Sequence, residues 1–128
     1  MARIKVLLVD DDPINNFIIK SKFVIDKSIE LIIYEDPEKA LDFLKNNTNS
    51  GLDIILLDIN MPVIDGWGFL TELDKMNKTY KVIFITSSIV VEHEKKARKN
   101  KQVVDYFIKP LEMDDVDRLI SKIKSMLS

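Results

Sequence analysis

Five short apolar runs divide the chain, and a segment with a different periodicity separates each run from the next. The runs are rich in isoleucine, valine and leucine and are almost continuously apolar. That pattern is typical of strands buried on both faces of a parallel sheet. The predicted strands are Ile4 to Val9, Ile29 to Tyr34, Leu52 to Leu57, Val82 to Ile85 and Val103 to Ile108.

The segments between and after these runs have apolar residues at intervals of three and four, which predicts helices. The clearest helix is C-terminal and carries Val116, Leu119, Ile120, Ile123 and Leu127. Asp36 and Pro37 have the chemistry of an N-cap and first turn, which predicts a helix through Leu44. Three further helices are marked by Ile14, Phe17, Ile18 and Ile25, by Phe69, Leu70, Leu73 and Met76, and by the charge-rich stretch from Val90 to Asn100.

Five strands alternating with five helices predict a three-layer α/β domain with right-handed crossovers. The length of 128 residues suits one domain, which we expect to cover residues 1–128. Apolar residues make up 46% and charged residues 31%, as in an ordinary soluble globular protein. No apolar run is long enough for a signal peptide or a membrane span, so we expect a cytoplasmic protein without a membrane partner.

Charge and residue types narrow the function classes. The net charge of -2 gives no broad reason to bind nucleic acid or an anionic membrane. The chain has no cysteine, which excludes disulfides, thiolate zinc sites and cysteine nucleophiles. His93 is the single histidine, which excludes a histidine-rich metal site. The basic run "EKKARKNK" is interpreted first as a solvated helix face, then as a protein-docking face, and last as a nucleic-acid contact.

Polar residues follow four of the five predicted strands. They are Asp10, Asp11 and Asp12 after the first strand, Asp58 after the third, Thr86 after the fourth and Lys109 after the fifth. Ligands of open parallel sheets bind outside the carboxyl ends of the strands. Carboxylate oxygens suit Mg²⁺, and a lysine can pair with a phosphoryl oxygen. The shared placement predicts a site for a divalent cation and a phosphoryl group.

Each of these acids also has a structural interpretation when taken alone. Asp12 before Pro13 is typical of a helix N-cap, and Asp65 before Gly66 is typical of a turn. The functional interpretation therefore depends on the joint placement at successive strand ends rather than on any one residue.

In this order the motifs "VLLVDDDP", "LLDINMPVIDGWGFL", "VIFITSS" and "DYFIKPLEMDDV" closely resemble the receiver domain of two-component response regulators. The resemblance covers the whole chain. It implies a flavodoxin-like, doubly wound sheet of five parallel strands in the order 2-1-3-4-5. No output domain follows the last predicted helix, which leaves two alternatives: a single-domain regulator or a fragment of a longer protein.

The resemblance also implies roles for individual residues. Asp58 would be the phosphoacceptor, giving 4-aspartylphosphate. Asp10 and Asp11 would be the acidic pair that holds Mg²⁺, with Asp11 a direct ligand and Asp10 acting largely through water. The backbone carbonyl of Asn60 would complete the protein ligands of the ion. Asp12 matches a variable position and is left out of the site.

Three further expectations come from the same resemblance. Thr86 and Lys109 would contact the phosphoryl group, and Tyr106 would be an aromatic switch residue. The Lys109–Pro110 peptide bond would be cis, although such bonds are uncommon in general.

The predicted function is a phosphorylation-controlled signalling module that catalyses only its own phosphorylation and dephosphorylation. A partner histidine kinase or phosphotransfer protein would donate the phosphoryl group, because no kinase motif surrounds His93. An unknown downstream protein would bind the switched face. The main alternative is a small Mg²⁺-dependent phosphatase with an aspartate nucleophile, which "LLDIN" also permits. A flavodoxin-like cofactor binder is a third, weakened by the lack of a phosphate-binding loop after the first strand.

Overall fold

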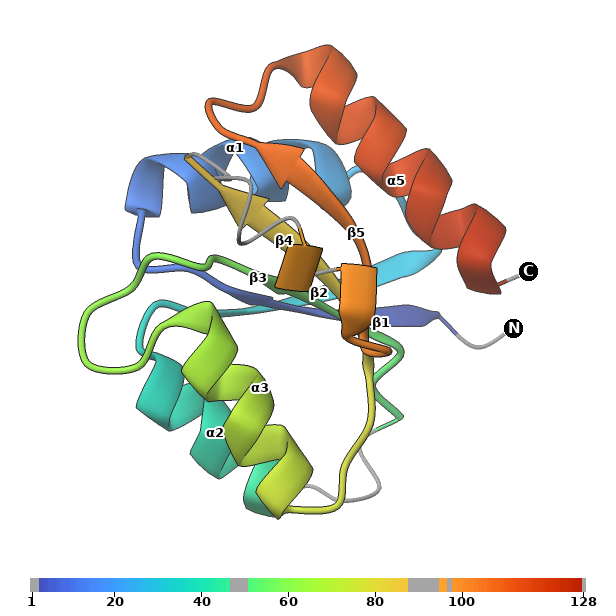
Figure 1. Ribbon diagram of the computed structural model, residues 1–128. Coiled ribbons are helices and arrows are strands. Elements are labelled where there is room, and N and C mark those ends of the chain that lie inside the picture. The colour runs from blue at the N-terminus through green and yellow to red at the C-terminus, as the bar shows by residue number, and fades with distance from the viewer. Residues whose placement is uncertain (1–2, 47–50, 88–94, 97, 128) are drawn as a thin grey trace.

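A computed structural model describes residues 3–46, 51–87, 95–96 and 98–127 of the chain. Its centre is a sheet of five parallel strands in the order β2-β1-β3-β4-β5, which confirms the predicted order (Figure 1). The strands are β1 (Ile4–Val9), β2 (Ile29–Tyr34), β3 (Ile54–Leu57), β4 (Lys81–Thr86) and β5 (Val103–Ile108). Every residue of β3 is fully buried, which explains its unbroken apolar sequence.

Four helices have defined bounds in the described part of the chain, where five were expected. They are α1 (Pro13–Phe23), α2 (Pro37–Asn46), α3 (Gly66–Lys75) and α5 (Met113–Leu127). The helix expected from Val90 to Asn100 lies mostly outside the described residues. Of its described residues, Lys95, Lys96, Arg98 and Lys99 are helical.

The helices cover both faces of the sheet and make two separate cores. Helices α1 and α5 lie on one face, where Ile19, Phe23 and Leu119 pack against the strands (Figure 1). Helices α2 and α3 lie on the other face, where Leu44 and Phe69 are fully buried. No helix among the described segments has the length and apolar character needed to cross a membrane.

Helix α1 turns a different face to the sheet from the one its apolar stripe suggests. Its buried residues are Asn15, Asn16, Ile19 and Phe23. Ile14 and Phe17, which marked the helix in the sequence, are each 72% exposed. The rotation follows from the first turn, where polar side chains point inward to the end of β1. An apolar stripe is therefore left on the outer surface of α1.

The ends of α1 and α3 are defined by aspartate caps. The Asp12 carboxylate accepts hydrogen bonds from the backbone N–H groups of Ile14 and Asn15, at 3.1 and 3.3 Å. The Asp65 carboxylate accepts one from Gly68 at 2.8 Å. The N-cap interpretation of Asp12 is confirmed, whereas Asp65, interpreted as a turn residue, is the N-cap of α3.

Gly66 allows the start of α3 to approach the end of β3. A Cβ atom at Gly66 would lie 2.9 Å from the carbonyl oxygen of Asp58 and 2.9 Å from the Phe84 ring. Both contacts are closer than packed atoms allow. A residue without a side chain is required here, so the loop after Asp58 can fold back tightly onto the sheet.

Candidate functional site

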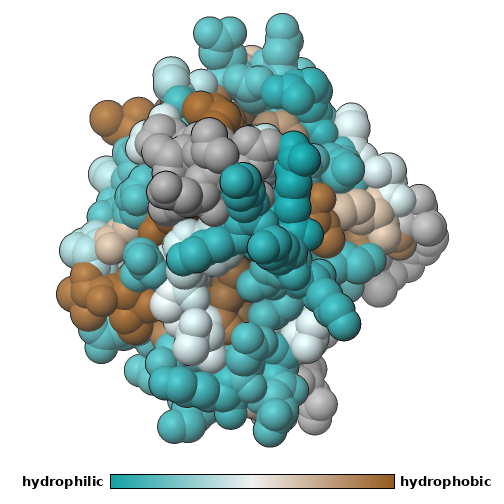
Figure 2. Space-filling model, viewed as in Figure 1, coloured by the Kyte–Doolittle hydropathy of each residue, from teal (hydrophilic) through white to brown (hydrophobic). Residues whose placement is uncertain are grey.

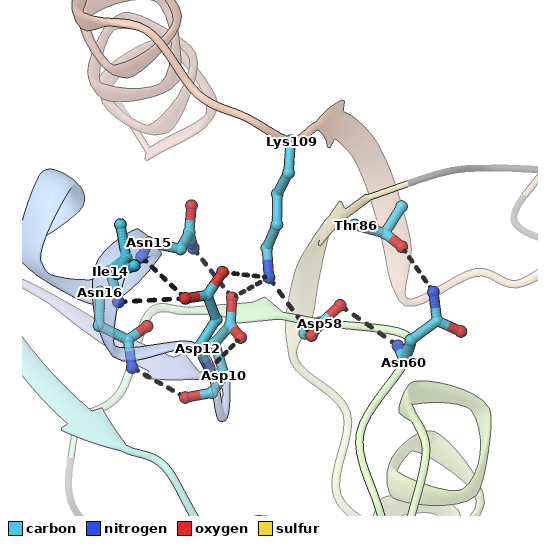
Figure 3. A network of polar contacts seen from close by, with 9 residues as sticks. All are labelled: Asp10, Asp12, Ile14, Asn15, Asn16, Asp58, Asn60, Thr86 and Lys109. Carbon is cyan, nitrogen blue, oxygen red and sulfur yellow. Dashed lines mark hydrogen bonds and ion pairs between the residues drawn. The ribbon is translucent and has the colours of Figure 1, made fainter.

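The ends of β1, β3, β4 and β5 bring the predicted polar residues to one edge of the sheet. Figure 3 shows the Lys109 side chain reaching between Asp10 and Asp58, with Thr86 and Asn60 joined to each other on the other side of Asp58. Asp10 and Thr86 are fully buried, and Asp58 is 4% exposed. Buried charges need partners, so the contacts inside this cluster determine what it can do.

Lys109 is shared among three carboxylates. Its ammonium nitrogen lies 2.8 Å from Oδ2 of Asp10, 3.4 Å from Oδ2 of Asp58 and 3.7 Å from Oδ2 of Asp12 (Figure 3). Burial lowers the pKa of Lys109, but the hydrogen bond to Asp10 and the three negative charges outweigh burial, so the net pKa is raised. The lysine stays charged, and its single positive charge leaves the acids incompletely neutralised.

The incomplete neutralisation of these charges affects the protonation of Asp58. Burial and the charge of Asp10 raise its pKa to about 6, against the opposing effects of Lys109 and of the Asn60 backbone N–H. That N–H donates to Oδ1 of Asp58 at 3.2 Å. Ionised Asp58 is therefore held at a cost in free energy near neutral pH, and a cation bound beside it would relieve that cost.

The acidic cluster fits a Mg²⁺ site. One carboxylate oxygen from each of Asp10, Asp11 and Asp58 lies within 4.8 Å of the other two. All are hard oxygen donors, which Mg²⁺ prefers. Asp11 is exposed whereas the other two are buried, so the cluster opens to solvent on one side. Water can reach the ion from that side, as an ion that keeps part of its hydration shell requires.

Thr86 and Asn60 lie on the far side of Asp58 from Lys109. The side-chain amide of Asn60 donates to the Thr86 hydroxyl oxygen at 3.3 Å (Figure 3). Tyr106 is outside this cluster: it pairs with Phe84 across β4 and β5 and packs, half-buried, against the core under α2 and α3. The expected cis bond between Lys109 and Pro110 is confirmed.

The structure adds two residues that the sequence did not assign to the site. Asp12, interpreted only as a cap, also faces Lys109. The side-chain amide of Asn15 donates to Oδ2 of Asp10 at 2.9 Å. With Asp12 as the N-cap, Asn15 is the third residue of α1, and a side chain at that position can turn back toward the residues that precede the helix. That position is the feature of the sequence from which Asn15 could have been assigned to the site.

A family model settles the class of protein. The model described as "Response regulator receiver domain" matches residues 6–123. The chain belongs to this family. Receiver domains are signalling domains of two-component systems, and the acidic cluster at the strand ends agrees with the magnesium pocket of such domains.

Curated relatives of this receiver domain include plant and bacterial proteins. The rice (Oryza sativa subsp. japonica) "Two-component response regulator ORR1" is 28% identical over 122 residues, covering 90% of this chain and 53% of the relative. The Staphylococcus epidermidis "Sensory transduction protein LytR" is 30% identical over 122 residues, covering 93% and 45%. The chain spans about half the length of these relatives.

Solved structures agree with the family assignment. A two-component response regulator from Cytophaga hutchinsonii superposes with a TM-score of 0.79 at 27% identity, covering 98% of this chain and 99% of that one. The receiver domain of the Francisella response regulator 1452 gives 0.77 at 31% identity, covering 98% and 100%. Both matches extend over nearly the whole receiver fold.

Proposed function

We propose that this receiver domain accepts a phosphoryl group on Asp58 and uses it to control a signalling partner. The observation that carries the proposal is the placement of Asp58, buried at the sheet edge beside the ammonium of Lys109, which also pairs with the carboxylate of Asp10. A histidine kinase or a histidine phosphotransfer protein would be the donor. The chain acts catalytically only on its own acyl phosphate.

The transfer needs an ionised nucleophile and neutralised charge. A carboxylate oxygen of Asp58 attacks the phosphorus atom, the N–P bond of the donor phosphohistidine breaks, and the imidazole keeps the bonding electrons. Asp10, Asp11, Asp58 and the backbone carbonyl of Asn60 would hold Mg²⁺. The ion would supply positive charge beside the carboxylates and the phosphoryl oxygens.

Lys109 and Thr86 would bind the phosphoryl group once it is attached. The ammonium of Lys109 already lies 3.4 Å from Asp58, so a small movement takes it to a phosphoryl oxygen. The Thr86 hydroxyl can donate to a second oxygen, and such a charge-assisted bond is about twice as strong as a neutral one. Donation by Thr86 draws its side chain toward Asp58.

Tyr106 would transmit that movement to a binding face. Its ring lies beside the core under α2 and α3, on the strand next to Thr86. The movement of Thr86 makes room for the ring to turn inward, which changes the surface of β5 and α5. A Mg²⁺–beryllofluoride complex mimics the phosphorylated state and should shift the NMR signals of Tyr106 and of this surface. A single unchanged Tyr106 rotamer in both states would rule out this route.

The donor would dock on exposed apolar side chains at the rim of the site. Ile14 and Phe17 are each 72% exposed on α1, and Val63 is 85% exposed on the loop after β3. Figure 2 shows hydrophobic side chains gathered at the left of the molecule, over the loop between β3 and α3, on a face that is otherwise mostly hydrophilic. Beside Lys109 a hollow of about 400 Å³ has a mixed lining of polar residues and of apolar residues that include Ile18 and Leu111. An apolar surface around a charged centre suits a protein donor.

Phe17→Ser tests this docking face. It should slow transfer from a cognate histidine kinase by about tenfold or more, because buried aromatic anchors carry much of an interface's binding energy. It should leave phosphorylation by a small-molecule phosphodonor unchanged. Ile25→Ser is the matched control, since Ile25 is also 72% exposed but lies beyond the far end of α1. Equal slowing by both variants would contradict the docking face.

The comparisons favour the receiver over the phosphatase and the cofactor binder, because the relatives and the family model are response regulators. A phosphodonor assay separates the first two. The receiver should gain one phosphoryl group from a small-molecule donor with Mg²⁺ and lose it slowly, without turnover of an external phosphomonoester. Sustained hydrolysis of such an ester would overturn the proposal.

A further inference from the structure

Asp10 has its carboxylate held by three donors in the described part of the chain. Oδ1 accepts from the backbone N–H of Asp12 at 2.9 Å. Oδ2 accepts from the side-chain amide of Asn15 at 2.9 Å and from the ammonium of Lys109 at 2.8 Å (Figure 3). Asp10 is fully buried, so each of these donors offsets part of the cost of burying its charge.

The two donors to Oδ2 differ in how they respond when a divalent cation or a phosphoryl group binds in the site. Lys109 is positive, sits on a flexible stem and is shared with Asp58 and Asp12. A divalent cation among the acids repels it, and a phosphoryl oxygen attracts it. Asn15 is neutral, so neither charge displaces it. When Lys109 moves to the phosphoryl group, Asn15 remains as the donor to this oxygen.

Asn15 is also rigidly placed. It is the third residue of α1 and is 4% exposed. Its own backbone N–H donates to the Asp12 cap at 3.3 Å. The next residue, Asn16, donates from its side chain to the carbonyl oxygen of Asp10 at 2.8 Å. The first turn of α1 is thus tied to the end of β1 at several points, which fixes the Asn15 amide relative to the Asp10 carboxylate.

We infer that Asn15 is a positioning residue that sets the Mg²⁺ affinity of the receiver by holding the Asp10 carboxylate toward the acidic cluster. The inference rests on the proposed function, which gives the ion to this cluster. Donors behind a metal ligand orient the ligand, and their loss typically weakens metal binding by about 10–100-fold. Without Asn15, the Asp10 carboxylate can rotate toward Lys109 and away from the ion.

The test is Mg²⁺ binding to the metal-free protein, measured by titration calorimetry. Asn15→Ala removes the donor, and Asn15→Leu removes it while keeping a side chain of the same branched shape. Both should raise the dissociation constant by about tenfold. Asn16→Ala is the matched control: Asn16 is 5% exposed on the same turn, but its side chain bonds the Asp10 backbone and not the carboxylate. It should change the constant by less than about threefold, because the three donors to the carboxylate stay in place.

Phosphorylation by a small-molecule donor gives a second readout. In Asn15→Ala the Mg²⁺ concentration that gives the half-maximal phosphorylation rate should rise in proportion to the dissociation constant. The phosphorylation rate at saturating Mg²⁺ should stay within about twofold of the parent rate, because Asn15 does not touch Asp58. An unchanged dissociation constant in both Asn15 variants would overturn the inference. So would equal weakening by Asn16→Ala, which would indicate general loosening of α1. Failure of the parent to bind Mg²⁺ would instead overturn the proposed function itself.

Discussion

Asp58→Asn should stabilise the metal-free receiver near neutral pH, although it removes the proposed phosphoacceptor. The parent carries a buried carboxylate whose pKa is raised to about 6 by burial and by Asp10. Asparagine has nearly the same shape and no charge, so it resembles the protonated acid. The variant avoids the cost of the buried charge without leaving a cavity.

The magnitude follows from proton linkage. Between the ordinary pKa of 3.8 and the folded value of about 6, the folded protein binds more protons at Asp58 than the unfolded chain does. The free energy of unfolding of the parent therefore falls as pH rises through this window and levels off above it. The cost of ionised Asp58 is about 1 kcal/mol at pH 4.5 and about 3 kcal/mol at pH 8. The advantage of Asp58→Asn should grow by about 2 kcal/mol between these pH values.

Urea unfolding of both proteins from pH 4.5 to 8, with chelator present, measures this difference. Asp42→Asn is the control, because it removes one negative charge from an exposed position on α2. Saturating Mg²⁺ should stabilise the parent more than the variant, since Asp58 is one of the proposed ligands. A difference between parent and Asp58→Asn that does not change with pH would refute the assigned electrostatics of the cluster.

Three further predictions concern the residues around Asp58, each measured by urea unfolding without metal. Lys109→Ala should lower the free energy of unfolding at pH 8 by about 3 kcal/mol, because three carboxylates lose a shared counter-ion; a loss below about 0.5 kcal/mol would count against this pairing. Gly66→Ala should cost at least about 2 kcal/mol, since its Cβ would meet the Asp58 carbonyl oxygen at 2.9 Å. Asp65→Ala should cost about 1 kcal/mol through the lost cap and Asp65→Asn only a few tenths; equal costs would contradict the cap.

The strands could be predicted from the sequence because their apolar runs are almost continuous, and β3, at the centre of the sheet, is fully buried on both faces. The bounds of β1, β2 and β5 agree with the apolar runs to the residue. Strand β3 begins at Ile54 and not at Leu52. There the Asp53 carboxylate accepts the backbone N–H of Lys5 at 2.9 Å, so a side chain takes a bond that a strand carbonyl would otherwise make.

The packing face of α1 could not be read from its apolar stripe. Asn15 and Asn16 are buried because their side chains donate hydrogen bonds to Asp10. The spacing of apolar residues does not indicate polar contacts of this kind. Because these bonds turn the two asparagines toward the sheet, the side chains of Ile14 and Phe17 are exposed on the outer surface of α1. For the site, the sequence showed which strand ends carry polar residues. The sharing of Lys109 among three acids depends on distances that only the fold supplies.

The central claim is that Asp58 takes the phosphoryl group with the help of Mg²⁺. The most direct measurement treats the protein with a small-molecule phosphodonor, traps the acyl phosphate by borohydride reduction and locates the resulting homoserine by tandem mass spectrometry. The account predicts homoserine at position 58 alone, with Mg²⁺ present and not with chelator. Homoserine at position 10 or 11, or equal labelling without the ion, would contradict it.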